Sequence, residues 1–118
     1  MMKTAIVIFP FLAIAAVTLS QTKPGDVANG RRIFMRNGCY QCHGTVAQGG
    51  LAGPRLAQTK LTVAGFTAYV RNPAPGSMPP FRAKVMSDQE LADVFAYVQS
   101  VPPPVAPANI PILNEDAR

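Results

Sequence analysis

The fold class that this sequence predicts is helical, with three α-helices in one small domain. Three separate segments carry apolar residues at the three- and four-residue spacing of an amphipathic helix. Each begins at a residue type that favours a helix N-terminus, and each stops before a glycine or a proline. At 118 residues the chain is long enough for one domain, so we expect a single apolar core.

The first helix is predicted over residues 27–37. Asp26 is the expected N-cap, and Gly38 is expected to end the helix. A glycine inside a helix costs about 1 kcal/mol relative to alanine, so we expect another element to approach closely at Gly30. The apolar stripe of this helix is formed by Val27, Gly30, Ile33 and Phe34.

The second helix is predicted to begin at its N-cap Thr62 and to stop at Asn72, because Pro73 follows. Residues 44–60, before this helix, show no regular spacing of apolar residues. Their glycines indicate a loop that winds around something. After the helix, residues 73–81 contain four prolines and can form neither a helix nor a central strand. The apolar side of the helix carries Val63, Phe66, Tyr69 and Val70.

The third helix has the clearest start signal in the chain. Ser87 and Glu90 form a capping box, in which each side chain can satisfy the backbone amide of the other. Pro102 and the prolines after it end the helix, and residues 102–118 are expected to form an extended, mobile, Pro-rich tail. The apolar positions of the helix are Leu91, Val94, Phe95 and Val98.

One short motif contains both cysteines and the only histidine. In Cys39-Tyr40-Gln41-Cys42-His43, a helical turn places Cys42 three positions and His43 four positions after Cys39, on one face. The two thiols can then add to the two vinyl groups along one porphyrin edge, while the imidazole of the same turn reaches the iron. The motif therefore predicts one haem c, attached through both cysteines, with His43 as an axial ligand.

The rest of the sequence weighs against other uses of a Cys-x-x-Cys pair. A structural zinc site needs four ligands, and the chain has two cysteines and one histidine in total. A thioredoxin-like redox pair expects a βαβ context, and no such pattern is present. A disulfide between Cys39 and Cys42 would close a tiny loop and gain little stability from it.

The iron also needs a sixth ligand, for which methionine is the remaining soft candidate. Two of the five methionines lie in the N-terminal apolar segment, Met35 lies just before the motif on the attachment side, and Met86 directly precedes the third helix. Met78 lies in the proline-stiffened loop, where a preformed backbone can hold a sulfur at low entropic cost. We therefore predict Met78 as the distal ligand; the alternative is that it only fills a gap in the core.

Residues 1–20 have the pattern of a secretory signal peptide. Lys3 lies in a short positive region, and an apolar run of 13 residues follows over residues 5–17. A helix needs about 20 apolar residues to span a bilayer, so we expect a cleaved signal and not a permanent anchor. We expect cleavage before Gln21 and a periplasmic mature protein with its domain over residues 21–101. Membrane association is expected only if the segment stays uncleaved.

Taken together, residues 26–101 resemble a small bacterial class I cytochrome c. The resemblance implies an all-α fold wrapped around one haem, with the first and last helices crossing. In that family a glycine and an aromatic residue of the first helix meet the last helix; here these contacts would involve Gly30, Phe34, Val94 and Tyr97. The most specific matching segments are residues 39–43, Gly53-Pro54-Arg55-Leu56, Met78-Pro79-Pro80 and residues 91–98.

The resemblance also assigns roles within the site. It too points to Met78 as the distal ligand, and it implies that the carbonyl of Pro54 accepts the second N–H of His43. Either Tyr69 or Arg55 would hydrogen-bond the haem edge or a propionate. The residues expected to pack against the haem, each of which could equally be ordinary core, are Leu56, Phe66, Tyr69 and Phe81.

The expected function follows from the ligation. With both axial positions filled, the iron has no open site, so we expect a one-electron carrier and not an enzyme. One alternative is a dedicated electron-accepting subunit of a periplasmic dehydrogenase. Another is a haem enzyme or gas sensor in which Met78 leaves and a substrate binds. The donor and the acceptor are not named by the sequence.

Charge is distributed unevenly and predicts how a partner is recognised. Residues 23–84 contain nine Lys or Arg and one acid, whereas residues 88–118 contain five acids and one base. Nucleic acid is a poor partner for an exported chain without a recognition motif. We expect a redox protein with an acidic docking patch, steered by basic side chains around the haem edge. The candidates are Arg55, Arg71, Arg82 and Lys84.

Overall fold

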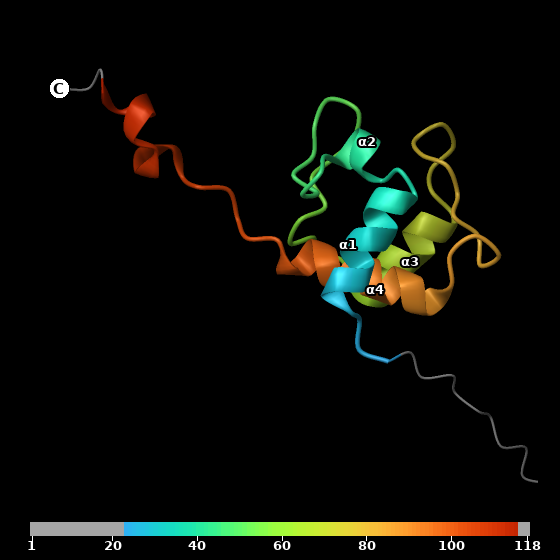
Figure 1. Ribbon diagram of the computed structural model, residues 1–118. Coiled ribbons are helices and arrows are strands. Elements are labelled where there is room, and N and C mark those ends of the chain that lie inside the picture. Colours follow the sequence, from blue (N-terminus) through green and yellow to red (C-terminus); the bar gives the residue numbers. More distant parts are fainter. Residues whose placement is uncertain (1–22, 116–118) are drawn as a thin grey trace, which may run out of the picture.

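The computed structural model describes residues 23–115, and within them every regular element is a helix (Figure 1). The all-α prediction is therefore confirmed. The predicted signal peptide, residues 1–20, lies outside the described residues. Over the part of the chain that is described, no helix combines the length and the apolar character needed to cross a bilayer. The α-helices are α1 (Val27–Arg36), α2 (Tyr40–His43), α3 (Val63–Arg71) and α4 (Asp88–Ser100).

The three predicted N-caps are all formed. Asp26 accepts a hydrogen bond from the backbone N–H of Asn29 at 2.8 Å, and Thr62 caps α3 in the same way. At α4 the capping box is complete, since Ser87 accepts from the N–H of Glu90 and the Glu90 carboxylate accepts from the N–H of Ser87. These local bonds satisfy amides that a helix start leaves without partners, which is why the helix boundaries could be predicted.

The first and last long helices cross at Gly30, as expected. A Cβ atom at Gly30 would collide with the backbone carbonyl of Asp93 in α4 and would lie 2.9 Å from the backbone nitrogen of Val94. One turn further along α1, the rings of Phe34 and Tyr97 meet edge-on, with their centroids 5.4 Å apart. The absence of a side chain at Gly30 therefore lets α1 and α4 pack backbone to backbone.

The core lies where α1, α3 and α4 meet, and two loops flank it (Figure 1). The loop after α2 lies on one side of the helices, and the loop between α3 and α4 lies on the other. The largest side chains without contact to solvent are Ile33, Phe34, Met86, Leu91 and Val98.

The C-terminal tail contains two short turns within the extended end that we expected. It runs away from the helices (Figure 1) and forms two 3-10 turns, η1 (Pro107–Asn109) and η2 (Pro111–Leu113). The side-chain amide of Asn114 donates to the backbone carbonyls of Pro107, Ala108 and Ile110. A proline at the start of each turn fixes its φ, and a backbone bond closes each turn, from Ile110 to Pro107 and from Asn114 to Pro111. A search for helical periodicity does not detect such short turns.

Asp93 is a buried carboxylate, 4% exposed, that links the start of α1 to α4. Its Oδ1 accepts from the backbone N–H of Asp26 at 2.9 Å and from the amide of Gln89 at 3.0 Å. Its Oδ2 accepts from the amide of Asn29 at 2.6 Å. Burial by itself would raise the pKa of Asp93, but these three donors outweigh it and hold the pKa below its usual value.

Asp93→Asn is expected to lower the free energy of unfolding at pH 7 by about 1–3 kcal/mol, because the new amide faces the donor of Asn29. The folded carboxyl has a lowered pKa, so its stabilisation is fully present above the unfolded pKa of about 3.9. It is lost as the pH falls through the lower folded pKa. Denaturant unfolding of both holoproteins between pH 7 and pH 2 checks this. The free energies of unfolding of the wild type and of Asp93→Asn should converge at the lowest pH. A difference that stays constant with pH would contradict the role of the Asp93 carboxylate.

Candidate haem site

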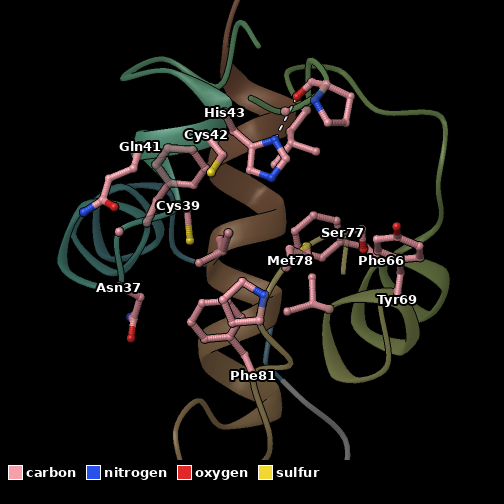
Figure 2. Close-up of a pocket in the computed structure, with 18 of the residues that line it drawn as sticks. Asn37, Cys39, Gln41, Cys42, His43, Phe66, Tyr69, Ser77, Met78 and Phe81 are labelled. Atoms are coloured by element: carbon pink, nitrogen blue, oxygen red, sulfur yellow. Dashed lines mark hydrogen bonds between the residues drawn. The ribbon is translucent and has the colours of Figure 1, made fainter. Parts of the chain in front are cut away.

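A cavity of about 320 Å³ is enclosed by α2, α3, α4 and the two flanking loops (Figure 2). This volume lies within the range of pockets that hold small ligands and cofactors. The structure brings every sequence-predicted site residue to this one cavity. They are Cys39, Cys42, His43, Pro54, Leu56, Phe66, Tyr69, Met78 and Phe81.

The helical turn predicted for the motif is present. Cys39 has helical backbone angles, with φ −55° and ψ −35°, and α2 continues directly from it. Figure 2 shows Cys39, Cys42 and His43 on the same side of the pocket. The two thiols and the imidazole therefore share one face, as the attachment chemistry requires.

The two cysteines are free thiols, half-buried at Cys39 and exposed at Cys42. Burial raises the pKa of the Cys39 thiol, although a hydrogen bond at its own backbone acts in the opposite direction. Redox-active cysteine pairs depend on a lowered pKa, so this environment does not favour the thioredoxin-like alternative. In the described part of the chain, no three His, Cys, Asp or Glu residues gather as a metal site, which gives the zinc alternative no support either.

His43 is held by the backbone of the loop after α2. Its Nδ1 lies 2.8 Å from the carbonyl oxygen of Pro54, the bond drawn in Figure 2. A carbonyl can only accept, so Nδ1 carries a proton, which in the neutral imidazole leaves the lone pair of Nε2 for a metal. A Cβ at Gly53 would lie only 3.0 Å from Nδ1, so glycine at this position lets the ring approach the loop backbone.

Met78 lines the cavity from the loop between α3 and α4, where it is half-buried (Figure 2). Met86 also reaches the cavity wall, but it is 1% exposed and belongs to the packed core. Met35 packs against the core and is not among the residues that line the cavity. This arrangement fits the choice of Met78 over Met86, which stays a prediction.

The walls between these two sides are apolar. Phe66 is buried and meets Phe95 edge-on at 5.5 Å, while Leu56 and Phe81 are half-buried. Tyr69 is 47% exposed. A flat apolar ring with a polar edge fits such a pocket. The donor set fits haem c as well, since it offers two thiols, one imidazole and one thioether sulfur.

Three cavity features were not predicted from the sequence. Met86 lines the wall although the sequence placed it only directly before the third helix. Leu61, just before the N-cap of α3, and Val70, near the end of α3, also line it. Gly53 supports His43, and its position next to Pro54 was the available signal. Whether an apolar side chain lines the cavity depends on which helix face is turned toward it. A single sequence does not reveal that orientation.

Two of the basic residues expected at the haem edge are used within the protein. The side chain of Arg71 is 14% exposed and is bound to Phe81, Met86 and Asp88, so it is not a free docking residue, and that expectation was wrong. Arg55 is exposed, is not among the lining residues, and donates to the carbonyl of Pro102 at 3.4 Å.

Comparison with known proteins gives a consistent result. Residues 25–98 match the family described as cytochrome c oxidase, cbb3-type, subunit III. Over 82 residues the chain is 32% identical to the Cbb3-type cytochrome c oxidase subunit CcoP of Rubrivivax gelatinosus. The aligned segment covers 66% of this chain and 27% of that protein. The chain thus spans about a quarter of the length of CcoP.

A second relative is similar in size to this chain. Over 98 residues the chain is 28% identical to cytochrome c-555 of Methylococcus capsulatus. The aligned segment covers 81% of this chain and 79% of the relative. No solved structure matches the chain. The family match extends over α1 to α4 and includes the motif at residues 39–43. The chain therefore belongs to the cytochrome c family described as cbb3-type oxidase subunit III, and it is a small class I c-type cytochrome, an electron-transfer protein of the haem c type.

Proposed function

We propose that this protein is a periplasmic one-electron carrier with a single covalent haem c. In this proposal Cys39 and Cys42 attach the haem, and His43 and Met78 are its axial ligands. The observation that carries the proposal is that one cavity receives two thiols and an imidazole from the α2 turn and a thioether sulfur from a separate loop. When bound, the haem supplies a one-electron couple between ferric and ferrous iron.

The residues around the site have distinct tasks in this proposal. The Pro54 carbonyl orients the His43 ring and fixes its tautomer. The prolines around Met78 hold its sulfur at low entropic cost. The apolar side chains of Leu56, Phe66 and Phe81 limit the access of water, which favours the less charged reduced state. Two fixed axial donors leave no coordination position for a substrate, which is why we propose a carrier and not an enzyme.

The proposed periplasmic location is supported by the signal-like pattern of residues 1–20. Covalent attachment through the motif at residues 39–43 is consistent with an exported chain. Association with a membrane is proposed only for a chain that keeps its N-terminal segment.

We propose that a partner with an acidic patch docks near the cavity. Arg82 and Lys84 are exposed in the same loop that carries Met78, and Arg82 borders a shallow hollow beside it. A carrier must associate and leave quickly, which favours steering by complementary charge over a large apolar interface. With Arg71 bound inside the protein, Arg82 and Lys84 carry this part of the proposal.

The second-order rate of electron exchange with the native partner is expected to fall steeply between 0.01 M and 0.1 M salt. The Debye length decreases over that range from ~30 Å to ~10 Å, so steering is screened. Arg82→Glu should lower the rate at low salt and flatten the salt dependence. Arg31→Glu on the exposed side of α1 makes the same change in net charge and serves as the control. Equal effects of the two variants would argue against docking at this loop.

A second candidate function is a dedicated subunit of a larger redox complex. The similarity to CcoP, whose name places it in a cbb3-type oxidase, favours an oxidase subunit over the dehydrogenase subunit that the sequence left as an alternative. A rate that is indifferent to salt, together with co-purification of the protein with an oxidase from native membranes, would support the subunit over the free carrier.

A further inference from the structure

Arg71, the last residue of α3, makes an unusual set of contacts for a basic side chain at a helix end. Its Nη1 donates to the backbone carbonyl of Phe81 at 2.6 Å and also to that of Met86. Its Nη2 pairs with the Asp88 carboxylate at 2.6 Å. One guanidinium thus connects the end of α3, two points along the following loop and the first turn of α4.

These contacts enclose the segment that carries Met78. Phe81 is held twice, because its N–H also donates to the carbonyl of Val70 at 3.0 Å. The nine residues 72–80, with Met78 among them, therefore form a loop whose two ends are joined at the end of α3. Met86, which follows this loop and precedes α4, is buried in the core. Its carbonyl therefore gives Arg71 a fixed hydrogen-bond acceptor.

The three interactions of Arg71 differ in strength. Asp88 is 68% exposed at its side chain, so its ion pair with Arg71 is screened by water. The two carbonyl bonds are partly buried and charge-assisted, and these are the stronger kind. Within the loop itself, the bonds between Ser77 and Ala74 close only one tight turn. The position of the loop relative to the cavity is therefore set mainly by the contacts of Arg71 and by the bond from Phe81 to Val70.

We propose that Arg71 is a positioning residue that holds Met78 against the haem by closing the loop between α3 and α4. This inference rests on the proposed ligation by Met78. Nη1 of the guanidinium reaches both carbonyls while Nη2 reaches the carboxylate, so the fixed fork holds all three acceptors together. A lysine ammonium is a single point charge on a flexible stem. Loss of the fork leaves the backbone bond from Phe81 to Val70 to join the two loop ends, so the ends separate more often and the thioether leaves its position more often.

The test measures how fast imidazole replaces the sulfur ligand in oxidised holoprotein, followed by loss of the weak sulfur-to-iron absorption at the red end of the spectrum. Arg71→Met keeps the apolar stem and removes the fork, and it is expected to bind imidazole about tenfold to hundredfold faster than wild type. Arg31→Met removes an exposed arginine from α1, outside the loop, and is expected to leave the rate unchanged. Arg71→Lys should give an intermediate rate.

Each outcome bears on a different statement. A wild-type protein without the sulfur-to-iron absorption would overturn the ligation by Met78 itself. If that absorption is present but Arg71→Met and Arg31→Met bind imidazole equally fast, the ligation stands and the role of Arg71 is wrong. If Arg71→Met yields no holoprotein, Arg71→Lys decides: a wild-type rate would overturn the proposal. Amide hydrogen exchange should also accelerate at Ser77, Met78 and Phe81 in Arg71→Met and not in α1, which separates loop opening from a general loss of stability.

Discussion

His43→Ala is expected to abolish almost all holoprotein, and alanine at Cys39 or Cys42 is expected to lower its yield. These three side chains leave the same helical turn toward one cavity, so each supplies a bond that no neighbouring residue can replace. In the wild-type protein the haem is expected to stay with the denatured chain during extraction with acidified organic solvent. Gln41→Ala, an exposed spacer in the same turn, is the matched control and should attach haem normally.

The apoprotein is expected to be largely unfolded. Phe34, Leu91 and Val94 line the cavity and also belong to the core, so without the haem one side of their packing is lost. The far-UV circular dichroism of the His43→Ala protein should therefore show much less helix than the holoprotein. Haem that leaves the wild-type chain in acidified solvent, or a fully helical apoprotein, would contradict this account.

Met78→Ala is expected to remove the sulfur-to-iron absorption, lower the reduction potential and open the reduced iron to carbon monoxide. The reason is that a thioether ligand stabilises ferrous iron, whereas its loss leaves one axial position empty. Optical spectra with and without carbon monoxide and a redox titration measure all three changes.

Met86→Leu is the control, since it conserves volume in the core and should cost less than about 1.5 kcal/mol of stability. Met86→Leu should keep the sulfur-to-iron absorption and the reduction potential of the wild type, and its reduced iron should not bind carbon monoxide. The reverse result would move the ligand by eight residues and make the assignment of Met78 wrong.

Local chemistry explains why the helix boundaries were predictable. The caps Thr62 and Ser87, the latter with Glu90, bind amides a few residues away, and Pro73 restricts the backbone of the residue before it. A glycine in the middle of a helix indicated the contact that the structure has at Gly30. The residues that gather at the cavity could be selected from the sequence because the candidate donors include rare residue types in this chain, one histidine and two cysteines.

The residues that were not predicted depend on contacts distant in sequence. Arg71 reaches partners 10, 15 and 17 residues away, and Asp93 reaches Asp26 across 67 residues. In the sequence both look like ordinary solvated charges, and Arg71 was assigned to a docking surface for that reason. Only the packing of the end of α3 against the loop, and of α1 against α4, gives them their partners.

The central claim, that both axial positions are filled by this chain, is tested most directly by adding carbon monoxide to the reduced wild-type holoprotein at neutral pH. The account predicts an unchanged spectrum, because His43 and Met78 occupy both positions. Formation of a carbon monoxide complex by most of the protein would contradict it, and would favour a haem enzyme or gas sensor in which the distal ligand leaves.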